Sequence, residues 1–374
     1  MKKNLITLLF SVVLMYGCTS SDNGGNADNN DNFDRSALLS NYADNIILPS
    51  IADFQAKVSA LDVARGNFIN NINQNNLDVL SNAWLEAYKA WQYVGIYNIG
   101  AAESFTSNEN GFRTYFNIYP VSTALIESGA ANSNYNLNAD AYFSAQGFPA
   151  LDFLLNGIAD TDASPLDKFT TNANATGYIQ YMTDVQSQIN ARTSTILNNW
   201  QDTFRDEFVS NTSSSATGSI SKIVNDYINY YERALRANKI GTPAGNFSAG
   251  QTFPDKVEAY YKNDVSKELA LLSLDAVQKF FNGQAIDGSS SSESLADYLV
   301  YLDNSTLKDD INTKFNAARQ QIQTLNNSFS QQVIDDNTQM TLAYDALQAA
   351  VILLKVDMAS ALDIQIDFVD NDGD

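Results

Sequence analysis

Apolar side chains recur every three, four or seven residues along four long segments of this chain, which is the spacing of helices that bury one face. The four stripes are Leu77, Leu80, Trp84, Tyr88 and Trp91; Val185, Ile189, Ile196, Trp200, Phe204 and Phe208; Ile311, Phe315, Ala318, Ile322, Leu325 and Phe329; and Tyr344, Leu347, Val351, Leu354, Met358 and Ala361. Proline interrupts helices because it lacks an amide hydrogen, and residues 166–242 and 255–374 contain none. The sequence therefore predicts an all-α fold.

Eight long helices are predicted, together with two irregular segments. The helices lie near residues 36–73, 76–104, 175–210, 219–238, 254–281, 292–302, 307–330 and 335–363. Residues 105–165 and 239–253 are irregular, and long loops inside a compact protein often carry function. The chain is longer than one core usually accommodates. We therefore predict two helical bundle domains, residues 35–212 and 213–374, divided near a polar run.

The first 34 residues are predicted to be an export signal and a tether. Two lysines precede an apolar stretch that is shorter than a membrane-spanning helix and ends at Gly17-Cys18. A small residue before cysteine resembles a bacterial lipoprotein processing site, so residues 1–17 would be removed and Cys18 lipidated. Residues 18–34 are rich in Gly, Ser, Asn and Asp, which predicts a flexible tether. The alternative is an ordinary secretory signal in which the cysteine is incidental.

The chain contains no histidine, the usual general base near neutral pH and the commonest metal ligand. This excludes zinc proteases with an HExxH motif and hydrolases with a Ser-His-Asp triad. Acidic residues outnumber basic residues by 43 to 22, and phosphate contacts need clustered Lys and Arg. Nucleic acid is therefore not an expected partner, and any chemistry must use carboxylates, tyrosines, lysines or backbone groups.

Five segments give the chain a resemblance to a known family. They are residues 83–91 (AWLEAYKAW), 118–121 (IYPV), 147–157 (GFPALDFLLNG), 239–245 (KIGTPAG) and the acidic end from 357 to 374. On these segments the chain resembles the imelysin-like family of bacterial envelope proteins (peptidase M75, iron-regulated protein A-like), particularly its lipoprotein branch in Bacteroidetes. The resemblance implies two related bundles, as in duplicated four-helix bundles, with irregular loops and a functional site in the cleft between them.

The GxHxxE motif of this family is degenerate in the chain. Aligned with GFPALD, its glycine falls on Gly147, its histidine on Pro149 and its glutamate on Asp152. Proline offers no lone pair and no N–H group, and it favours the start of a helix. Asp152 is therefore a candidate metal ligand that has lost its partner. The alternative is an acid in the first turn of a helix, where the helix dipole favours a carboxylate.

Trp91 and Lys239 are candidate ligand-binding residues with two interpretations each. Trp91 lies on an aromatic helix face, which is more typical of a core than of a ligand platform. Lys239 begins the KIGTPAG segment. It either complements the dipole at the C-terminus of a helix or, as the resemblance suggests, faces the cleft.

Arg113 and Tyr119 are a second pair of candidates, in the irregular segment that precedes the degenerate motif. An arginine among tyrosines can bind a carboxylate or another anionic ligand through two parallel hydrogen bonds. The alternative for Arg113 is an internal ion pair with Glu103 or Asp152.

Three function hypotheses follow. The first is a lipid-anchored outer-membrane protein, facing the periplasm or the outside, that binds iron or haem in the cleft without catalysis and works with an uptake receptor. Oxygen donors such as carboxylate and phenolate suit Fe(III), and iron is the one cofactor that the resemblance suggests. The second is a metallopeptidase-like enzyme with a metal site of carboxylates alone, including Asp152, although catalytic zinc usually has three protein ligands with histidine among them. The third is a structural partner of an outer-membrane receptor.

Overall fold

The structure, a computed structural model, describes residues 32–108, 110–289 and 293–368. Cys18 and the predicted signal peptide lie outside these residues. The structure is 69 % helical without a β-strand in its described part, so the predicted all-α class is confirmed. The residues from Asp34 onward form one unit by their contacts. None of the described helices is long and apolar enough to cross a membrane.

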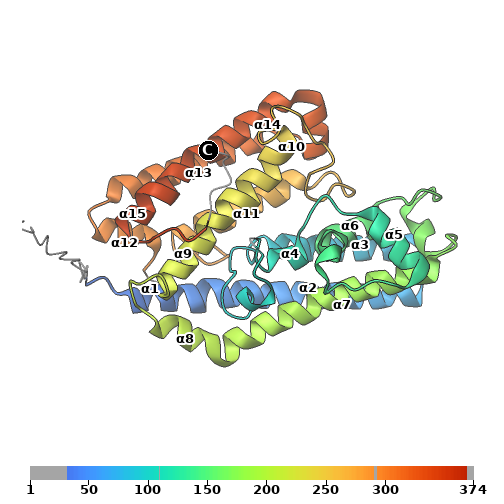
Figure 1. The fold of residues 1–374 in the computed structure, drawn as a ribbon, viewed down its shortest axis with the longest axis horizontal. Helices are drawn as coiled ribbons and strands as arrows, with labels where there is room; N and C mark the ends of the chain where they lie inside the picture. Colours follow the sequence, from blue (N-terminus) through green and yellow to red (C-terminus); the bar gives the residue numbers. More distant parts are fainter. Residues whose placement is uncertain (1–31, 109, 290–292, 369–374) are drawn as a thin grey trace, which may run out of the picture. The chain divides into compact units, whose positions relative to one another are not determined.

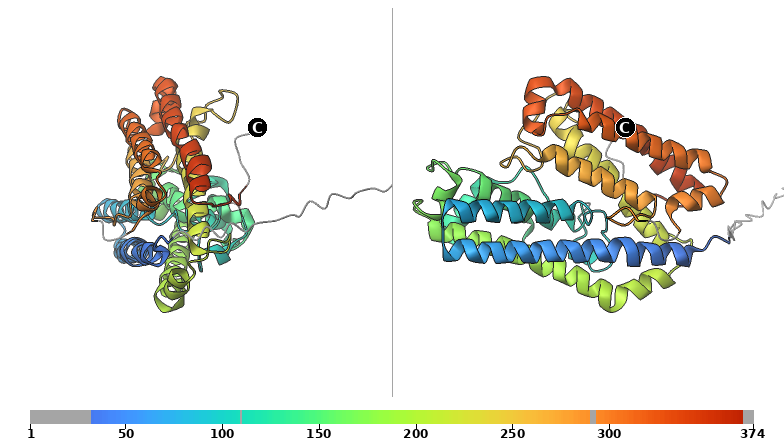
Figure 2. Two further views of the ribbon diagram at one scale, coloured as in Figure 1. Left: turned by 90° about the vertical axis from the view of Figure 1, so that its left-hand side faces the viewer. Right: turned by 180° about the vertical axis from the view of Figure 1, so that it is seen from behind.

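The first set of helices lies between residues 35 and 210 (Figures 1 and 2). The set begins with one continuous helix, which comprises α1 (Arg35–Asn41), the π-helical η1 (Tyr42–Ile47) and α2 (Leu48–Asn70). The longer partners are α3 (Gln74–Trp91), α5 (Thr123–Asn132), α6 (Gly147–Asn156) and α7 (Ala175–Asn199), which η5 (Trp200–Phe204) and α8 (Arg205–Ser210) follow directly. The other short elements are η2 (Glu103–Phe105), α4 (Arg113–Phe116), η3 (Asp140–Ala145) and η4 (Pro165–Phe169). α2 packs on α3 and α7, and α7 packs on α5 and α6.

The second set of helices begins after the polar run at residues 211–218 (Figure 1). Its elements are α9 (Ser219–Asn229), the π-helical η6 (Tyr230–Gly241), α10 (Thr242–Ala244), α11 (Ser266–Phe281), α12 (Leu295–Tyr301), α13 (Ser305–Gln323), α14 (Phe329–Ile352), η7 (Leu353–Met358) and α15 (Ala359–Ala361). α13 packs on α14 and α11, and η6 packs on α14 and α11. The division into two independent domains near residue 212 stays a prediction.

The predicted apolar stripes are the buried faces of these helices. Their side chains are buried except for Phe204, Tyr344 and Ala361, which are partly exposed. Polar caps help to start three of the helices, because the side chains of Asn73, Ser294 and Ser328 accept hydrogen bonds from backbone amides three residues later. Periodicity and capping together therefore place most of the long helices.

Two predicted helices are shorter than expected. The helix predicted to reach residue 104 ends at Trp91, and that predicted to begin at 254 begins at Ser266. In the second case Ala259 and Asn263 have positive φ values of 56° and 74°, which a helix does not accommodate. Tertiary contacts hold residues 254–265 in this non-helical path, and they also build the candidate site.

Candidate functional site

The GFPALD segment begins α6 through its glycine. Gly147 has a φ of +72°, and a Cβ atom on it would lie 2.3 Å from the carbonyl oxygen of Phe116. No other residue fits this position without moving the backbone. Pro149 is buried in the first turn of α6, which agrees with its predicted role at a helix start.

Asp152 lies in the second turn of α6 and not in the first, and its carboxylate binds a neighbouring segment. It is the sixth residue of α6, so the interpretation as a first-turn acid is wrong. Its carboxylate accepts hydrogen bonds from the backbone amides of Tyr261 (2.8 Å) and Lys262 (2.9 Å), and from the Asn156 side chain (3.0 Å). Asp152 therefore ties α6 to the irregular segment that precedes α11.

Burial is the main influence on the acidity of Asp152. Its side chain is 1 % exposed, and burial raises the pKa of Asp152 to about 7, against the opposing effect of the hydrogen bonds from Tyr261, Asn156 and Lys262. The carboxyl group thus changes charge near neutral pH while it holds two backbone amides.

A buried ion pair joins Lys239 of η6 to Glu258 in the segment before α11. The two side chains are 3 % and 2 % exposed, and Nζ of Lys239 donates to Oε2 of Glu258. Nζ also donates to Oε1 of Gln92 at 3.0 Å. Burial lowers the pKa of Lys239, while the Glu258 carboxylate opposes that effect. Lys239 is therefore a buried partner of Glu258, and it also lies in the last turn of η6, where a cation complements the helix dipole.

Side chains from the first helix set complete the hydrogen bonds of this pair. Oε1 of Glu258 accepts from Asn117 at 2.7 Å and from Gln92 at 3.3 Å. The hydroxyl of Tyr88 donates to Asn117, and the hydroxyl of Ser273 donates to Gln92 at 2.7 Å. The result is one polar network, buried at its centre, that crosses from the first helix set to the second.

A cavity lies beside this network. Two adjoining hollows, of about 20 and 290 Å³, share five lining residues, Asn110, Asn117, Ile118, Tyr119 and Asn238. The two hollows are termed the Tyr119 cavity. Trp91, Arg113 and Lys239 line the smaller hollow, so four of the five predicted ligand residues converge at this cavity. Asp152 is not among its lining residues.

One wall of the Tyr119 cavity is the π-helical segment η6. Its lining residues are Tyr230, Arg233, Ala234, Ala237, Asn238 and Lys239. A π-helix has a wider turn than an α-helix and occurs frequently at functional sites. The opposite wall comes from residues 110–119 and from Trp91 at the end of α3, which also stacks on Phe116 with ring centres 4.6 Å apart. Trp91 is thus both a core residue and part of the cavity wall.

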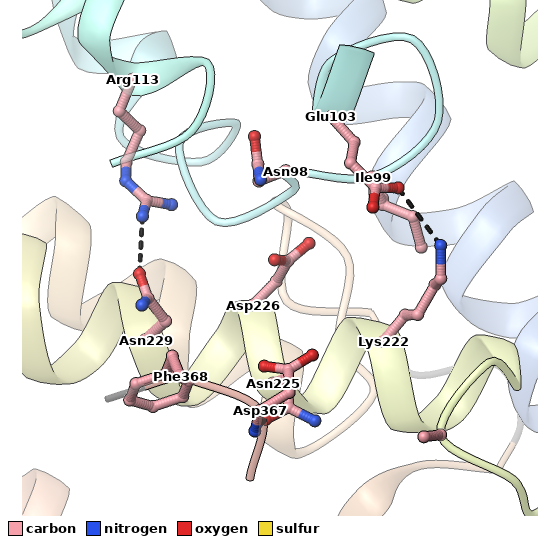
Figure 3. Close-up of a pocket in the computed structure, with 11 residues that line it drawn as sticks. Asn98, Ile99, Glu103, Arg113, Lys222, Asn225, Asp226, Asn229, Asp367 and Phe368 are labelled. Atoms are coloured by element: carbon pink, nitrogen blue, oxygen red, sulfur yellow. Dashed lines mark hydrogen bonds and ion pairs between the residues drawn. The ribbon is translucent and has the colours of Figure 1, made fainter. Parts of the chain in front are cut away.

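Arg113 lines the Tyr119 cavity and also a second cavity of about 270 Å³, which Figure 3 shows. Its guanidinium donates to Asn229 at 2.6 Å and to the carbonyl oxygen of Gly95 at 3.3 Å. The predicted ion pair with Glu103 or Asp152 is wrong, because Glu103 pairs with Lys222 at 3.2 Å and Asp152 binds backbone amides.

The second cavity has an acidic lining. Glu103, Asp226 and Asp367 line it, and Asp226 points into its centre in Figure 3. Burial raises the pKa of Asp226 well above its usual range, and the nearby Arg113 opposes that shift. Arg113 therefore lines one cavity with acids and another that has no acid among its described lining residues.

Sequence reasoning missed the partners of the predicted residues. Glu258, Gln92 and Asn117 form the centre of the network, and Lys256 lines the cavity. Gln92 directly follows the AWLEAYKAW segment and Asn117 directly precedes IYPV, so proximity to these motifs was the one available signal. No such signal pointed to Glu258 or Lys256, because residues 254–265 were predicted to be helical.

The described residues contain no group of three or more His, Cys, Asp or Glu side chains that could hold a metal ion. Asp152 lies among backbone amide donors rather than among other acids. A metal role for Asp152 stays a prediction. The chemistry that the cavity offers is hydrogen bonding and positive charge.

Asp152 is expected to make stability depend on pH. Because its folded pKa of about 7 exceeds the unfolded value of about 3.9, its contribution to stability is full below the unfolded pKa and is lost as pH rises through 7. The free energy of unfolding of the natural protein, relative to Asp152→Asn, should fall by about 2 kcal/mol from pH 5 to pH 8. Urea unfolding measures this, with Asp206→Asn, 86 % exposed, as control. A difference that does not vary with pH contradicts the assignment.

Removal of one partner of the buried ion pair should destabilise the fold strongly. Lys239→Met leaves the Glu258 carboxylate buried without its cation, which costs about 3–5 kcal/mol. The double variant Lys239→Met with Glu258→Gln removes the charge and keeps an acceptor for Asn117, so it should recover about half of that loss. Urea unfolding of the single and double variants tests this. Additive losses in the double variant would show that the two charges do not interact.

One comparison with known proteins identifies a family. Residues 47–355 match the model of the imelysin family (Peptidase_M75). No curated protein matches the chain in sequence.

Two solved structures have a similar fold. A proposed iron-regulated protein A precursor from Parabacteroides distasonis ATCC 8503 is 16 % identical, with a TM-score of 0.70 over 88 % of this chain and 95 % of that one. An imelysin-like protein from Psychrobacter arcticum 273-4 is 18 % identical, with a TM-score of 0.68 over 90 % and 97 %. Similarity at this level of identity concerns the fold alone. Because the family model covers most of the sequence, the chain belongs to the imelysin family.

Proposed function

We propose that this chain is a lipid-anchored protein of the cell envelope that binds a ligand of iron or haem acquisition in the Tyr119 cavity, without catalysis. The observation that carries the proposal is the convergence of Trp91, Arg113, Tyr119 and Lys239 on one cavity. Both helix sets contribute to its walls, as binding sites between packed units commonly require. Membership of the imelysin family, and the fold shared with a proposed iron-regulated protein A precursor, support the connection with iron.

The contacts at the site favour binding over peptide hydrolysis. A catalytic zinc site takes three protein ligands and an open position for water, and no group of three candidate ligands occurs among the described residues. Both oxygens of Asp152 already accept hydrogen bonds. The metallopeptidase hypothesis would be supported instead by proteolysis that a chelator and Asp152→Ala both abolish.

The envelope location is proposed from the sequence around Cys18. A lipid on this residue would hold the folded part near a membrane through the tether at residues 18–34. An outer-membrane uptake receptor is the partner that this location suggests. Crosslinking in envelope extracts, followed by purification of this chain, would identify such a partner.

Ligand binding is expected to depend on the Tyr119 hydroxyl. In calorimetric titrations with Fe(III) chelates, haem and divalent metals, at least one ligand should bind, and Tyr119→Phe should weaken its binding about tenfold, or about 1.4 kcal/mol. Tyr301→Phe is a matched control, because Tyr301 is 48 % exposed on α12 and does not line the cavity. Absence of binding across the panel, together with normal growth of a deletion strain under iron limitation, would refute the proposal.

Lipidation at Cys18 predicts the location of the protein. The natural chain should incorporate labelled palmitate and sediment with the membrane fraction. Cys18→Ser should abolish both, because a soluble domain without the acyl chains has no comparable membrane affinity. Immunoblots of the two fractions, with labelling in parallel, measure the effect. Retention of Cys18→Ser in the membrane would show another mode of attachment.

A further inference from the structure

The lining of the Tyr119 cavity has a sign of charge opposite to that of the whole chain. Its described lining residues include four cations, Arg113, Arg233, Lys239 and Lys256, and no acid. The chain as a whole has 43 acids against 22 bases and a net charge of −21. A local group of cations in such a chain creates a positive potential where a ligand would lie.

Two of these cations, Arg113 and Lys256, form no direct ion pair with a described residue, although the nearby Asp226 carboxylate opposes the effect of burial on the pKa of Arg113. Arg113 donates to the neutral oxygens of Asn229 and Gly95, and Nζ of Lys256 lies 3.8 Å from the ring centre of Phe253. Neither forms an ion pair with any described residue. Burial lowers the pKa of Arg113, although a guanidinium remains protonated in proteins.

Two acids lie near the cavity without being among its described lining residues. Glu258 is paired with Lys239, and Asp226 lines the second cavity together with Arg113. Arg113 and Lys256 are therefore the lining cations that form no ion pair with a described residue.

Neutral hydrogen-bond donors accompany the cations. The hydroxyl of Tyr119 makes no hydrogen bond to a described residue. Burial, with the field of Glu258, raises the pKa of Tyr119 well above its usual range, so the hydroxyl keeps its proton and can donate it. The amides of Asn110 and Asn238 line the same space. Cations and neutral donors around one cavity suit an oxyanion.

The size of the cavity limits the ligand. Its larger hollow has a volume of about 290 Å³, and a water molecule takes roughly 30 Å³. The space thus holds roughly ten water molecules, or a compact molecule of similar volume. A di- or tricarboxylate fits this limit.

We propose that the Tyr119 cavity binds a small polycarboxylate, free or as its ferric complex. Lys256 in the larger hollow and Arg113 in the smaller one would hold separate carboxylate groups, and Tyr119, which lines both hollows, would donate a hydrogen bond to a third oxygen. This inference rests on the proposed function for its link to iron, since it makes the ligand an anionic chelate and not a bare metal ion or haem. The binding of the anion itself does not require that link.

The direct test is calorimetric titration of the protein as purified from cells with citrate, Fe(III)-citrate, acetate and inorganic phosphate. Citrate or Fe(III)-citrate should bind at least tenfold more tightly than acetate and phosphate. The affinity should fall several-fold from 50 to 300 mM salt, because screening weakens attraction between charges. Equal or tighter binding of phosphate, or no binding of either citrate form, would overturn the proposal.

Variants of Lys256 separate a charge effect from a folding defect. Lys256 is half-buried at the cavity edge, so Lys256→Gln should fold normally and weaken citrate binding about tenfold, and Lys256→Glu should weaken it further. Lys308→Gln on α13 is the matched control, because Lys308 does not line the cavity. Urea unfolding of each variant shows whether it is folded. Unchanged citrate affinity in folded Lys256→Glu would overturn the proposal.

The two proposals fail in different ways. If citrate binds with the expected dependence on Lys256, but iron does not alter binding and a deletion strain grows normally under iron limitation, the polycarboxylate site stands and the iron function fails. If haem or a bare metal ion binds with an affinity that Lys256→Glu leaves unchanged, a role in iron acquisition stands and the polycarboxylate site fails.

Discussion

The buried ion pair between Lys239 and Glu258 is the contact on which the rest of the site depends. Two charges taken out of water cost several kcal/mol each, and their attraction offsets this only when the remaining hydrogen bonds are also made. Those bonds come from Gln92 and Asn117 in the first helix set, whereas the charges belong to the second. The two sets must therefore meet in one arrangement for the charges to be satisfied, and that arrangement forms the wall of the Tyr119 cavity.

The ion pair between Lys239 and Glu258 also affects which residues give the cavity its positive electrostatic potential. Because Glu258 neutralises Lys239, the lysine that the KIGTPAG segment contributes is structural in its effect. The positive charge available to a ligand comes from Arg113 and from Lys256, which lies two residues before Glu258. The chain thus combines a neutral buried pair with two cations, the buried Arg113 and the half-buried Lys256, that form no ion pair with a described residue, and a strongly acidic protein acquires a local site for an anion.

The helical fold could be predicted from the sequence because it depends on local periodicity, whereas the site depends on tertiary contacts. The stripe from Leu77 to Trp91 marks α3 whatever surrounds it. The segment carrying Lys256 and Glu258 leaves the helical conformation because distant groups bind it, and no local pattern reveals that. Likewise, η6 keeps an amphipathic pattern that an α-helix would share, so its π-helical turns and the cavity wall they form could not be foreseen.

The degenerate motif connects these observations. Where the family pattern has histidine, Pro149 offers no ligand, and both oxygens of Asp152 accept the amides of Tyr261 and Lys262. These amides follow Lys256 and Glu258 by only a few residues. The hydrogen bonds to Asp152 therefore fix the loop that carries Lys256 and Glu258. A carboxylate that is used in this way has few free lone pairs for a metal ion. In this chain the motif therefore contributes by positioning this loop. The side chains proposed to bind the ligand lie on η6, on the same loop and on residues 110–119.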